Sequence, residues 1–148
     1  MSPIERFAGY AAAFERAYQT DDWSALAPYF TEDAVYEIGL PVLGNERCAG
    51  RAEILAWFKR VLDGFDRRFE SRELTLLAGP EERDGAVWIR GSATYRAARV
   101  PDLVLTLEET ARFDGDRIAS LEDRYTPEMA AEAAAYLERH AEALGLSL

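Results

Sequence analysis

Cysteine and histidine are almost missing from this 148-residue sequence, and their scarcity removes several classes of function. Cys48 is the single cysteine, so the chain has no intrachain disulfide and no CxxC metal or redox motif. His140 is the single histidine, which excludes most zinc sites and most Ser-His or Cys-His catalytic pairs. We therefore expect no metal and no cofactor, and a nucleophilic role for Cys48 is disfavoured because it has no neighbouring general base.

Long apolar runs and an excess of positive charge are also lacking. No apolar run approaches the ~20 residues that a membrane span needs. Residues 1–6 do not combine a basic stretch with a following apolar one, so they do not form a secretory signal, and we expect a cytoplasmic protein without a membrane partner. The net charge of −10 would repel a phosphate backbone, which argues against a nucleic-acid partner.

The remaining composition is that of an ordinary globular domain. Hydrophobic residues make up 49% of the chain and charged residues 30%. The length suits one hydrophobic core, and no linker or repeat interrupts the pattern. We expect a single domain over residues 1–148, with a core at about 4–125 and an additional C-terminal helix at about 127–144.

Helical patterns precede the strands. Residues 2–5 (SPIE) are a capping box with proline at the first helical position, and they begin a helix that ends near residue 20. A short second helix is expected at 23–30 and a third at 51–65, each with one apolar face. Thr126-Pro127 starts the final helix, and Gly145 follows its end.

Alternating patterns predict five strands. They cover residues 34–38, 69–78, 86–98, 102–113 and 117–125, and Asp114-Gly115-Asp116 is a hairpin signal between the last two. Residues 31–33 are expected to be a turn, 39–50 an apolar loop and 81–85 a polar hairpin tip. Helices grouped ahead of a meander of strands indicate an α+β fold with an antiparallel sheet.

Four segments carry a family resemblance. They are residues 21–26 (DDWSAL), 29–36 (YFTEDAVY), 50–54 (GRAEI) and 111–118 (ARFDGDRI). The chain resembles the nuclear transport factor 2-like superfamily, which includes SnoaL-like polyketide cyclases, ketosteroid isomerases and limonene epoxide hydrolases. The resemblance implies a cone-shaped sheet wrapped around three N-terminal helices, with a small-molecule pocket inside and frequent dimers.

The ketosteroid isomerase pattern is not matched. That chemistry uses a carboxylate base and two hydroxyl-type donors. By the resemblance, the first-helix tyrosine falls on Phe14, the carboxylate on Ile38 and the second donor on Thr106. Neither phenylalanine nor isoleucine can transfer a proton, so this activity is rejected.

The limonene epoxide hydrolase pattern is matched in part. By the resemblance, Arg90 takes the place of the bridging arginine, Asp123 of one carboxylate and Tyr36 of the tyrosine. Ser92 stands where the second carboxylate would be, and Ile38 replaces the asparagine. SnoaL-like cyclases require less, namely an aspartate acid or base in an apolar cavity, and Asp123 is the candidate for that role.

The resulting site hypothesis names three candidate catalytic residues, Asp123, Arg90 and Tyr36, with Asp123 and Arg90 as an ion pair. The candidate ligand-binding residues are Phe14, Ile38, Trp57, Trp88, Ser92, Thr106, Leu121 and Tyr125. Alternation also requires either Glu108 or Glu109 to face inward, and the sequence leaves open which one.

Two functions remain possible from the sequence. The first is a cofactor-independent isomerase, hydrolase or cyclase that uses Asp123 as an acid or base on a small apolar or partly polar molecule. The second is a non-catalytic ligand-binding or scaffold domain in which Arg90 and Asp123 form a structural pair. In both, apolar residues on both faces of 86–98 and 102–113 predict a homodimer through the outer face of the sheet.

Overall fold

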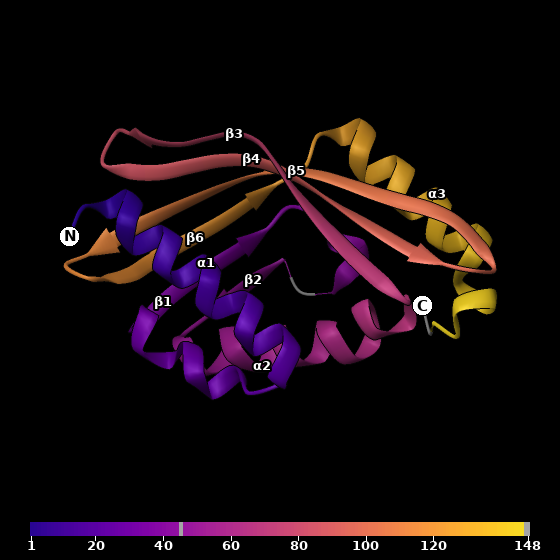
Figure 1. Cartoon of the computed structure of the whole chain (residues 1–148), viewed down its shortest axis with the longest axis horizontal. Coiled ribbons are helices and arrows are strands. Elements are labelled where there is room, and N and C mark those ends of the chain that lie inside the picture. The colour runs from indigo at the N-terminus through magenta and orange to yellow at the C-terminus, as the bar shows by residue number, and fades with distance from the viewer. Residues whose placement is uncertain (45, 147–148) are drawn as a thin grey trace.

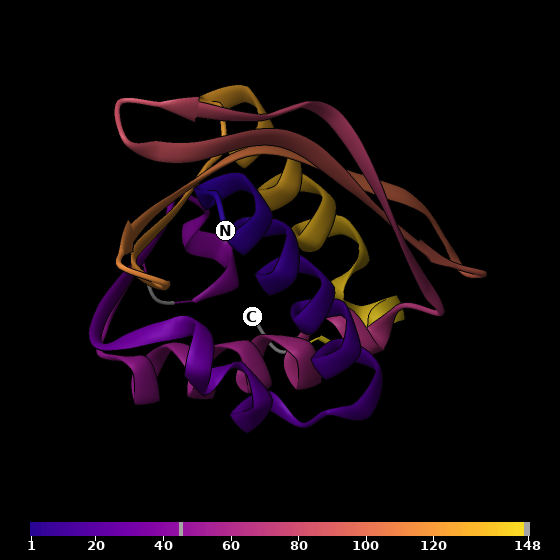
Figure 2. The same cartoon turned by 60° about the vertical axis from the view of Figure 1, so that its left-hand side comes forward.

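The computed structural model describes residues 1–44 and 46–146 and confirms the α+β cone. A curved sheet of six strands forms one layer, in the order β2-β1-β6-β5-β4-β3. Figures 1 and 2 show the first two α-helices lying inside the curve of the sheet. The C-terminal helix lies alongside strand β5. Within the described residues, no helix has both the length and the apolar character that a membrane crossing requires.

Local capping signals explain where the long helices begin and end. Helix α1 covers Pro3–Thr20, and Ser2 Oγ accepts a hydrogen bond from the backbone N–H of Glu5 while the Glu5 side chain accepts one from Ser2. Helix α2 covers Arg51–Gly64. Helix α3 covers Pro127–Leu144, begins at a Thr126 cap, and ends at Gly145 with a φ of 69°. The caps at Ser2, Thr126 and Gly145 therefore lie where the sequence predicted them, and they satisfy backbone groups at the helix ends.

Three short 3₁₀ helices lie in the connections of the described chain. They are η1 (Trp23–Tyr29), η2 (Pro41–Leu43) and η3 (Asp66–Arg68). The expected second helix is therefore a 3₁₀ helix rather than an α-helix, and Pro28 lies inside it. Proline lacks the N–H that a regular α-helical ladder requires, which is consistent with the tighter, shorter form.

Three of the five predicted strands are longer than the sequence indicated, two end one residue earlier, and one further strand is present. They are β1 (Phe30–Ile38), β2 (Arg47–Ala49), β3 (Ser71–Arg83), β4 (Ala86–Ala97), β5 (Val100–Asp114) and β6 (Arg117–Arg124). The predicted turn at 31–33 is part of β1, the predicted loop at 39–50 contains η2 and β2, and β3 continues through the predicted tip to Arg83. Gly39 donates its N–H to the carbonyl of Asp123, so backbone pairing with the sheet extends into that segment.

One pairing in the sheet is parallel, which corrects the expectation of an antiparallel sheet. Strand β1 pairs with β6 in parallel, with Tyr36 opposite Leu121 and Ile38 opposite Asp123, whereas the other pairs are antiparallel. Parallel partners must be joined by a long connection, and here the whole of α2 and four strands, β2 to β5, intervene. The pairing brings the first and last strands of the chain together in the middle of the sheet.

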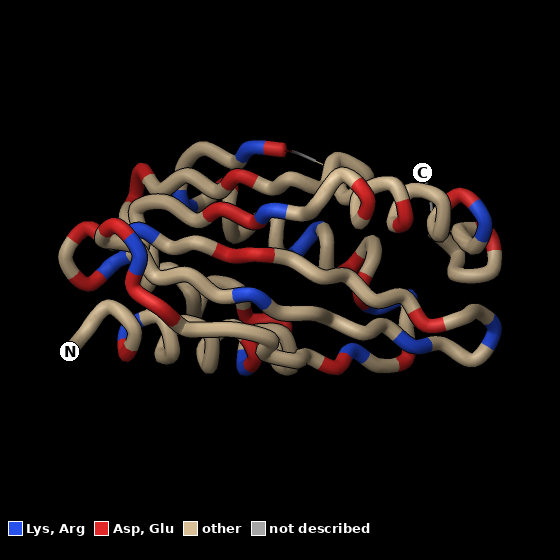
Figure 3. The backbone as a smooth tube through the Cα atoms, turned by 90° about the horizontal axis from the view of Figure 1, so that it is seen from above, with Lys and Arg blue, Asp and Glu red and all other residues tan. Residues whose placement is uncertain are grey.

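Helix α3 lies along the edge of β5 that β6 leaves unpaired beyond Arg124. The Tyr136 hydroxyl donates to the carbonyl of Pro101 at 2.6 Å, and the Thr106 N–H lies 3.4 Å from Met129 Sδ. Leu77 and Val104 remain 47% and 46% exposed. Val104, on the outer face of β5, therefore stays uncovered, and the homodimer through that face remains a prediction. Viewed from above, Lys and Arg positions are scattered among Asp and Glu positions along the strands (Figure 3).

Candidate functional site

A cavity of about 450 Å³ lies between the helices and the inner face of the sheet. Its walls come from α1, η1, α2 and strands β3 to β6, with Tyr36 contributed by β1. Most of the wall is aliphatic or aromatic, and the rings pack on one another: Tyr36 lies edge-on to Trp57, with ring centroids 5.3 Å apart. Leu74 and Leu76 line the cavity yet are 52% and 58% exposed, so the cavity opens to solvent along β3, the edge strand.

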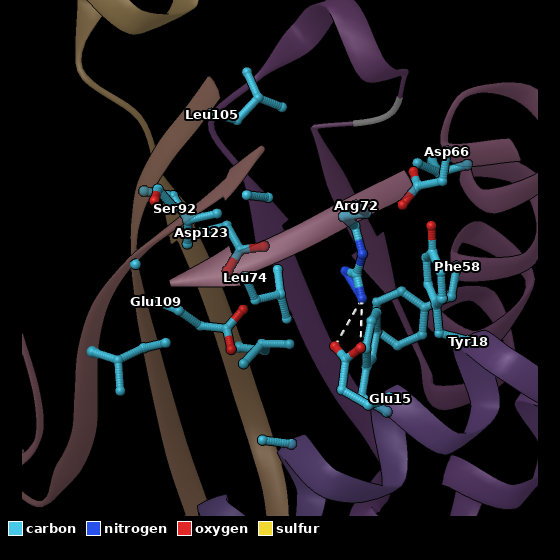
Figure 4. Close-up of a pocket in the computed structure, with 18 of the residues that line it drawn as sticks. Glu15, Tyr18, Phe58, Asp66, Arg72, Leu74, Ser92, Leu105, Glu109 and Asp123 are labelled. Carbon is cyan, nitrogen blue, oxygen red and sulfur yellow. Dashed lines mark hydrogen bonds and ion pairs between the residues drawn. The ribbon is translucent and has the colours of Figure 1, made fainter. Parts of the chain in front are cut away.

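A pair of carboxyl groups faces this cavity from neighbouring strands. Asp123 on β6 is the direct register partner of Glu109 on β5, and paired residues of antiparallel strands point to the same face. Asp123 is only 7% exposed, and the Tyr36 hydroxyl donates a hydrogen bond to its Oδ2. Oδ1 of Asp123 is buried without a hydrogen-bond partner among the described residues. Figure 4 shows both carboxyls directed into the same space.

Burial determines the electrostatics of the pair. It raises the pKa of Glu109 well above the ordinary value for glutamate, and the neighbouring Asp123 charge raises it further. Burial also raises the pKa of Asp123, but hydrogen bonding to Glu109 and Tyr36 opposes the rise. Burial and the charge of Asp123 raise the pKa of the Tyr36 hydroxyl, which therefore stays a donor. Glu109 is consequently the member of the pair that keeps its proton more strongly.

A second polar group lies in another part of the cavity wall. Arg72 on β3 donates from Nη2 to both carboxylate oxygens of Glu15, at 2.7 and 2.8 Å, and its guanidinium lies 3.9 Å from the centroid of the Tyr18 ring. Asp66 on η3 is nearby, and burial raises its pKa to about 6. In Figure 4 this group of four residues is separate from Glu109 and Asp123.

Most residues of the site hypothesis do line the cavity. Asp123, Tyr36, Phe14, Trp57, Ser92, Leu121 and Tyr125 are all part of its wall. Ser92 pairs in register with Thr106, whose side chain belongs to the outer face, so Ser92 lies at a boundary of the wall. Ile38 is buried in the core next to Asp123 in the sheet but is not part of the wall.

Three residues of the site hypothesis lie on the wrong side of the sheet. Arg90, Trp88 and Thr106 are on the outer face; Arg90 and Thr106 line a groove there, and Trp88 Nε1 donates to Glu108 at 3.1 Å. Arg90 pairs in register with Glu108, whereas Glu109 pairs with Asp123. Because successive residues of a strand point to opposite faces, Arg90 cannot form the expected ion pair with Asp123. That part of the hypothesis is wrong.

The structure also settles which glutamate faces inward, and it adds residues that the sequence did not single out. Glu109 faces the cavity and Glu108 faces the outer groove. Arg72, Glu15 and Asp66 were missed. Arg72 and Glu15 are charged residues on faces that are otherwise apolar, and this pattern could have marked them as candidate site residues. Nothing in the sequence indicates that their side chains are in contact. Among the described residues, no three His, Cys, Asp or Glu side chains gather as metal ligands.

The cavity therefore combines an apolar body with a few polar atoms that have no hydrogen-bond partner among the described residues. Trp57 Nε1 and Arg72 Nε are buried donors without an acceptor, and Asp123 Oδ1 is a buried acceptor without a donor, within the residues described. Buried polar groups are nearly always hydrogen-bonded, so such atoms usually have a ligand or water as a partner. An apolar pocket with a few convergent polar groups is typical of small-molecule sites.

Comparison with known proteins agrees with this architecture. The sequence pattern of the SnoaL-like domain matches residues 11–137, so the chain belongs to the SnoaL-like family. No curated protein sequence matches the chain.

Several solved structures share the fold at low sequence identity. TerC, co-crystallised with polyporic acid, has a TM-score of 0.67 at 14% identity, over 93% of this chain and 99% of its own. A putative SnoaL-like polyketide cyclase from Shewanella denitrificans OS-217 has a TM-score of 0.64 at 16% identity, over 93% and 99% of the two chains. An epoxide hydrolase from M. tuberculosis, similar to the limonene enzyme, reaches 0.59 at 16% identity, over 93% and 96%. At these identities the likeness concerns the fold.

Proposed function

We propose that the protein is a cofactor-independent enzyme that uses Glu109 and Asp123 as an acid–base pair on a small, uncharged and mainly apolar molecule. The observation that carries the proposal is the pair itself: two carboxyls on adjacent strands, with a tyrosine donor, inside an apolar cavity. Two like charges this close cannot both ionise readily, so the pair shares one proton near neutral pH. One site then offers a proton donor and a proton acceptor together.

Each residue has a distinct role. Asp123, whose charge is stabilised by hydrogen bonding to the Tyr36 hydroxyl and to Glu109, is the base that accepts a proton from a substrate carbon or a water molecule. Glu109, whose pKa burial raises well above its ordinary value, is the acid that protonates a substrate oxygen. Tyr36 is held by Trp57 and by Phe58, whose ring centroids lie 5.3 and 5.6 Å away, and it positions Asp123.

The same pair suits two reactions that occur among the structural neighbours. In a cyclisation or isomerisation, Asp123 takes a proton from the carbon beside a carbonyl while Glu109 gives its proton to the carbonyl oxygen. In epoxide hydrolysis, Asp123 takes a proton from water, the hydroxyl attacks a ring carbon, and Glu109 protonates the oxygen that leaves that carbon. Neighbours described as a polyketide cyclase and an epoxide hydrolase support testing both.

The test compares turnover in matched variants. Wild-type protein is assayed against a panel of apolar epoxides by diol formation, and against apolar ketones by exchange of their α-protons with deuterated water. We expect Asp123→Asn and Glu109→Gln to lower turnover at least about 100-fold, as loss of a general acid or base does. Glu108→Gln, one residue away on the opposite face, is the control and should leave turnover unchanged.

Two results would contradict the proposal. If turnover is found and neither inner-face substitution reduces it, the carboxyl pair is not the catalytic group. If members of the panel bind in the cavity but show neither hydrolysis nor exchange, the protein is a binding domain, which is the second function that the sequence left open.

A further inference from the structure

The second polar group in the cavity has no part in the proposed proton transfer, and Arg72 is its centre. Arg72 lines the cavity with a side chain that is 8% exposed. Its Nη2 is held by Glu15, and the Tyr18 ring lies against its guanidinium. Its Nε is buried without a hydrogen-bond partner in the described part of the chain. The side chain is therefore fixed by Glu15 and Tyr18, and the Nε–H, on the same edge of the guanidinium as Nη2, is an unused donor.

Burial of such a donor has a cost that a structural role does not explain. Leaving a charged group short of a hydrogen bond is destabilising in a low-dielectric site. A purely structural Arg72–Glu15 pair could be replaced by apolar side chains at similar or better stability. A hydrogen-bond acceptor on a ligand would explain the arrangement, because the Nε donor of Arg72 is satisfied when the ligand occupies the cavity.

The charges in the wall restrict which acceptor fits. Arg72 is the one Lys or Arg among the lining residues of the described chain, and the same lining holds four carboxyl residues, namely Glu15, Asp66, Glu109 and Asp123. The Glu15 carboxylate already neutralises Arg72. A ligand carboxylate would therefore meet a wall with an excess of negative charge, whereas a carbonyl or hydroxyl oxygen would accept from Arg72 without that repulsion.

The distance between Arg72 and the carboxyl pair indicates how long the ligand is. Arg72 pairs with Tyr95 on β4, whereas Glu109 pairs with Ile89, six residues along the same strand. At about 3.3 Å per residue the two backbone positions are separated by roughly 20 Å, a distance that the side chains shorten from both ends. Arg72 and the carboxyl pair can thus contact different ends of one molecule, as their separate places in Figure 4 indicate.

We propose that Arg72 recognises an uncharged hydrogen-bond acceptor, a carbonyl or hydroxyl oxygen, at the end of the substrate opposite the reacting group, and that the cavity excludes anions. Arg72 is a specificity-determining residue in this scheme, and the reference to a reacting group rests on the proposed function. The substrate class is then an elongated apolar molecule with one oxygen function at each end.

Three ligands with one apolar body test the proposal by calorimetry at pH 8: naphthalene, 2-acetylnaphthalene and 2-naphthoate. We expect wild-type protein to bind 2-acetylnaphthalene at least about tenfold more tightly than naphthalene, and 2-naphthoate more weakly than either. Arg72→Met should abolish the tenfold preference and leave naphthalene affinity within about twofold. Arg90→Met removes an arginine from the outer face and should change none of the three affinities.

Arg72→Met leaves Glu15 without its partner, so the double variant Glu15→Gln/Arg72→Met provides the same measurement if the single variant does not fold. The proposal is overturned if wild-type protein does not distinguish the ketone from naphthalene, if the preference survives loss of Arg72, or if the naphthoate binds best. Glu109→Gln should retain the ketone preference. A failure of the proposed catalysis would therefore leave this binding result standing, and the reverse also holds.

Discussion

Replacement of Tyr36 by phenylalanine should show how strongly the cavity depends on a charged Asp123. The Tyr36 hydroxyl donates to Asp123 Oδ2, and Asp123 Oδ1 already lacks a partner among the described residues. Removing the hydroxyl therefore leaves Oδ2 of a buried carboxylate without its donor. A hydrogen bond to a charged group contributes about 1.5–3 kcal/mol, so we expect Tyr36→Phe to lower the free energy of unfolding by about 2–3 kcal/mol at pH 7.

A double-mutant cycle separates this contribution from loss of packing. In an Asp123→Asn background the hydrogen bond is between neutral groups, for which about 1 kcal/mol is typical. The coupling between the two sites should thus be about 1–2 kcal/mol, measured by urea unfolding followed by far-ultraviolet circular dichroism. The control is Tyr136→Phe, which removes a hydroxyl bonded to the exposed carbonyl of Pro101. We expect it to cost no more than about 1 kcal/mol.

The reasoning is refuted if Tyr36→Phe costs under about 0.5 kcal/mol, or if the two substitutions are additive within the error of the cycle. Either result would mean that Asp123 is uncharged at pH 7 or that water replaces the phenol without loss. The proposed division of roles, with Asp123 as base and Glu109 as acid, would then need to be reversed or abandoned.

Three further results are expected. Burial raises the pKa of Glu109, so the folded chain keeps a proton that the unfolded chain releases above about pH 4.5, and the free energy of unfolding falls as the pH rises through that region. Urea titrations of Glu109→Gln should therefore show a gain in stability relative to wild type between pH 4 and pH 8. Asp66 has a pKa raised from 3.8 to about 6, worth at most about 3 kcal/mol, so wild-type stability should decline between pH 4 and 6 in thermal unfolding. The decline should be smaller in Asp66→Asn, where the contribution of Glu109 remains, and an unchanged slope in that variant would contradict the prediction. Arg90→Met should change the free energy of unfolding by less than about 0.5 kcal/mol, and a loss of several kcal/mol would mean that Arg90 has a buried partner.

Local features of the fold could be predicted from the sequence because their causes lie within a few residues. The Ser2 and Thr126 caps, the end of α3 at Gly145 and the turn at Gly115 each depend on one or two side chains acting on the adjacent backbone. The extension of β1 back to Phe30 and the strand β2 depend instead on pairing with distant segments. Propensity does not encode such pairing, which is why residues 31–33 resembled a turn.

The candidate site shows the same division more sharply. Tyr36 could be named from the sequence because it lies in a segment with a recognisable family pattern, and Asp123 because it lies on the strand that begins in another such segment. The choice between Glu108 and Glu109 depends on the register of β5, where a shift of one residue moves every side chain to the other face. The same alternation of faces places the side chain of Arg90 on the outer face of the sheet. Arg72 and Glu15 meet only because α1 lies against β3, a contact between helix and sheet that no local pattern predicts.

The position of β6 has a consequence for synthesis of the chain. This strand is the sixth in sequence but lies third in the sheet, between β1 and β5. Until residues 117–124 leave the ribosome, the β1–β2 pair and the β3–β4–β5 meander have no strand to join them, and each presents an unpaired edge. The nascent chain thus carries two sheet fragments that can associate with other molecules, and Asp123 arrives with the strand that closes both edges.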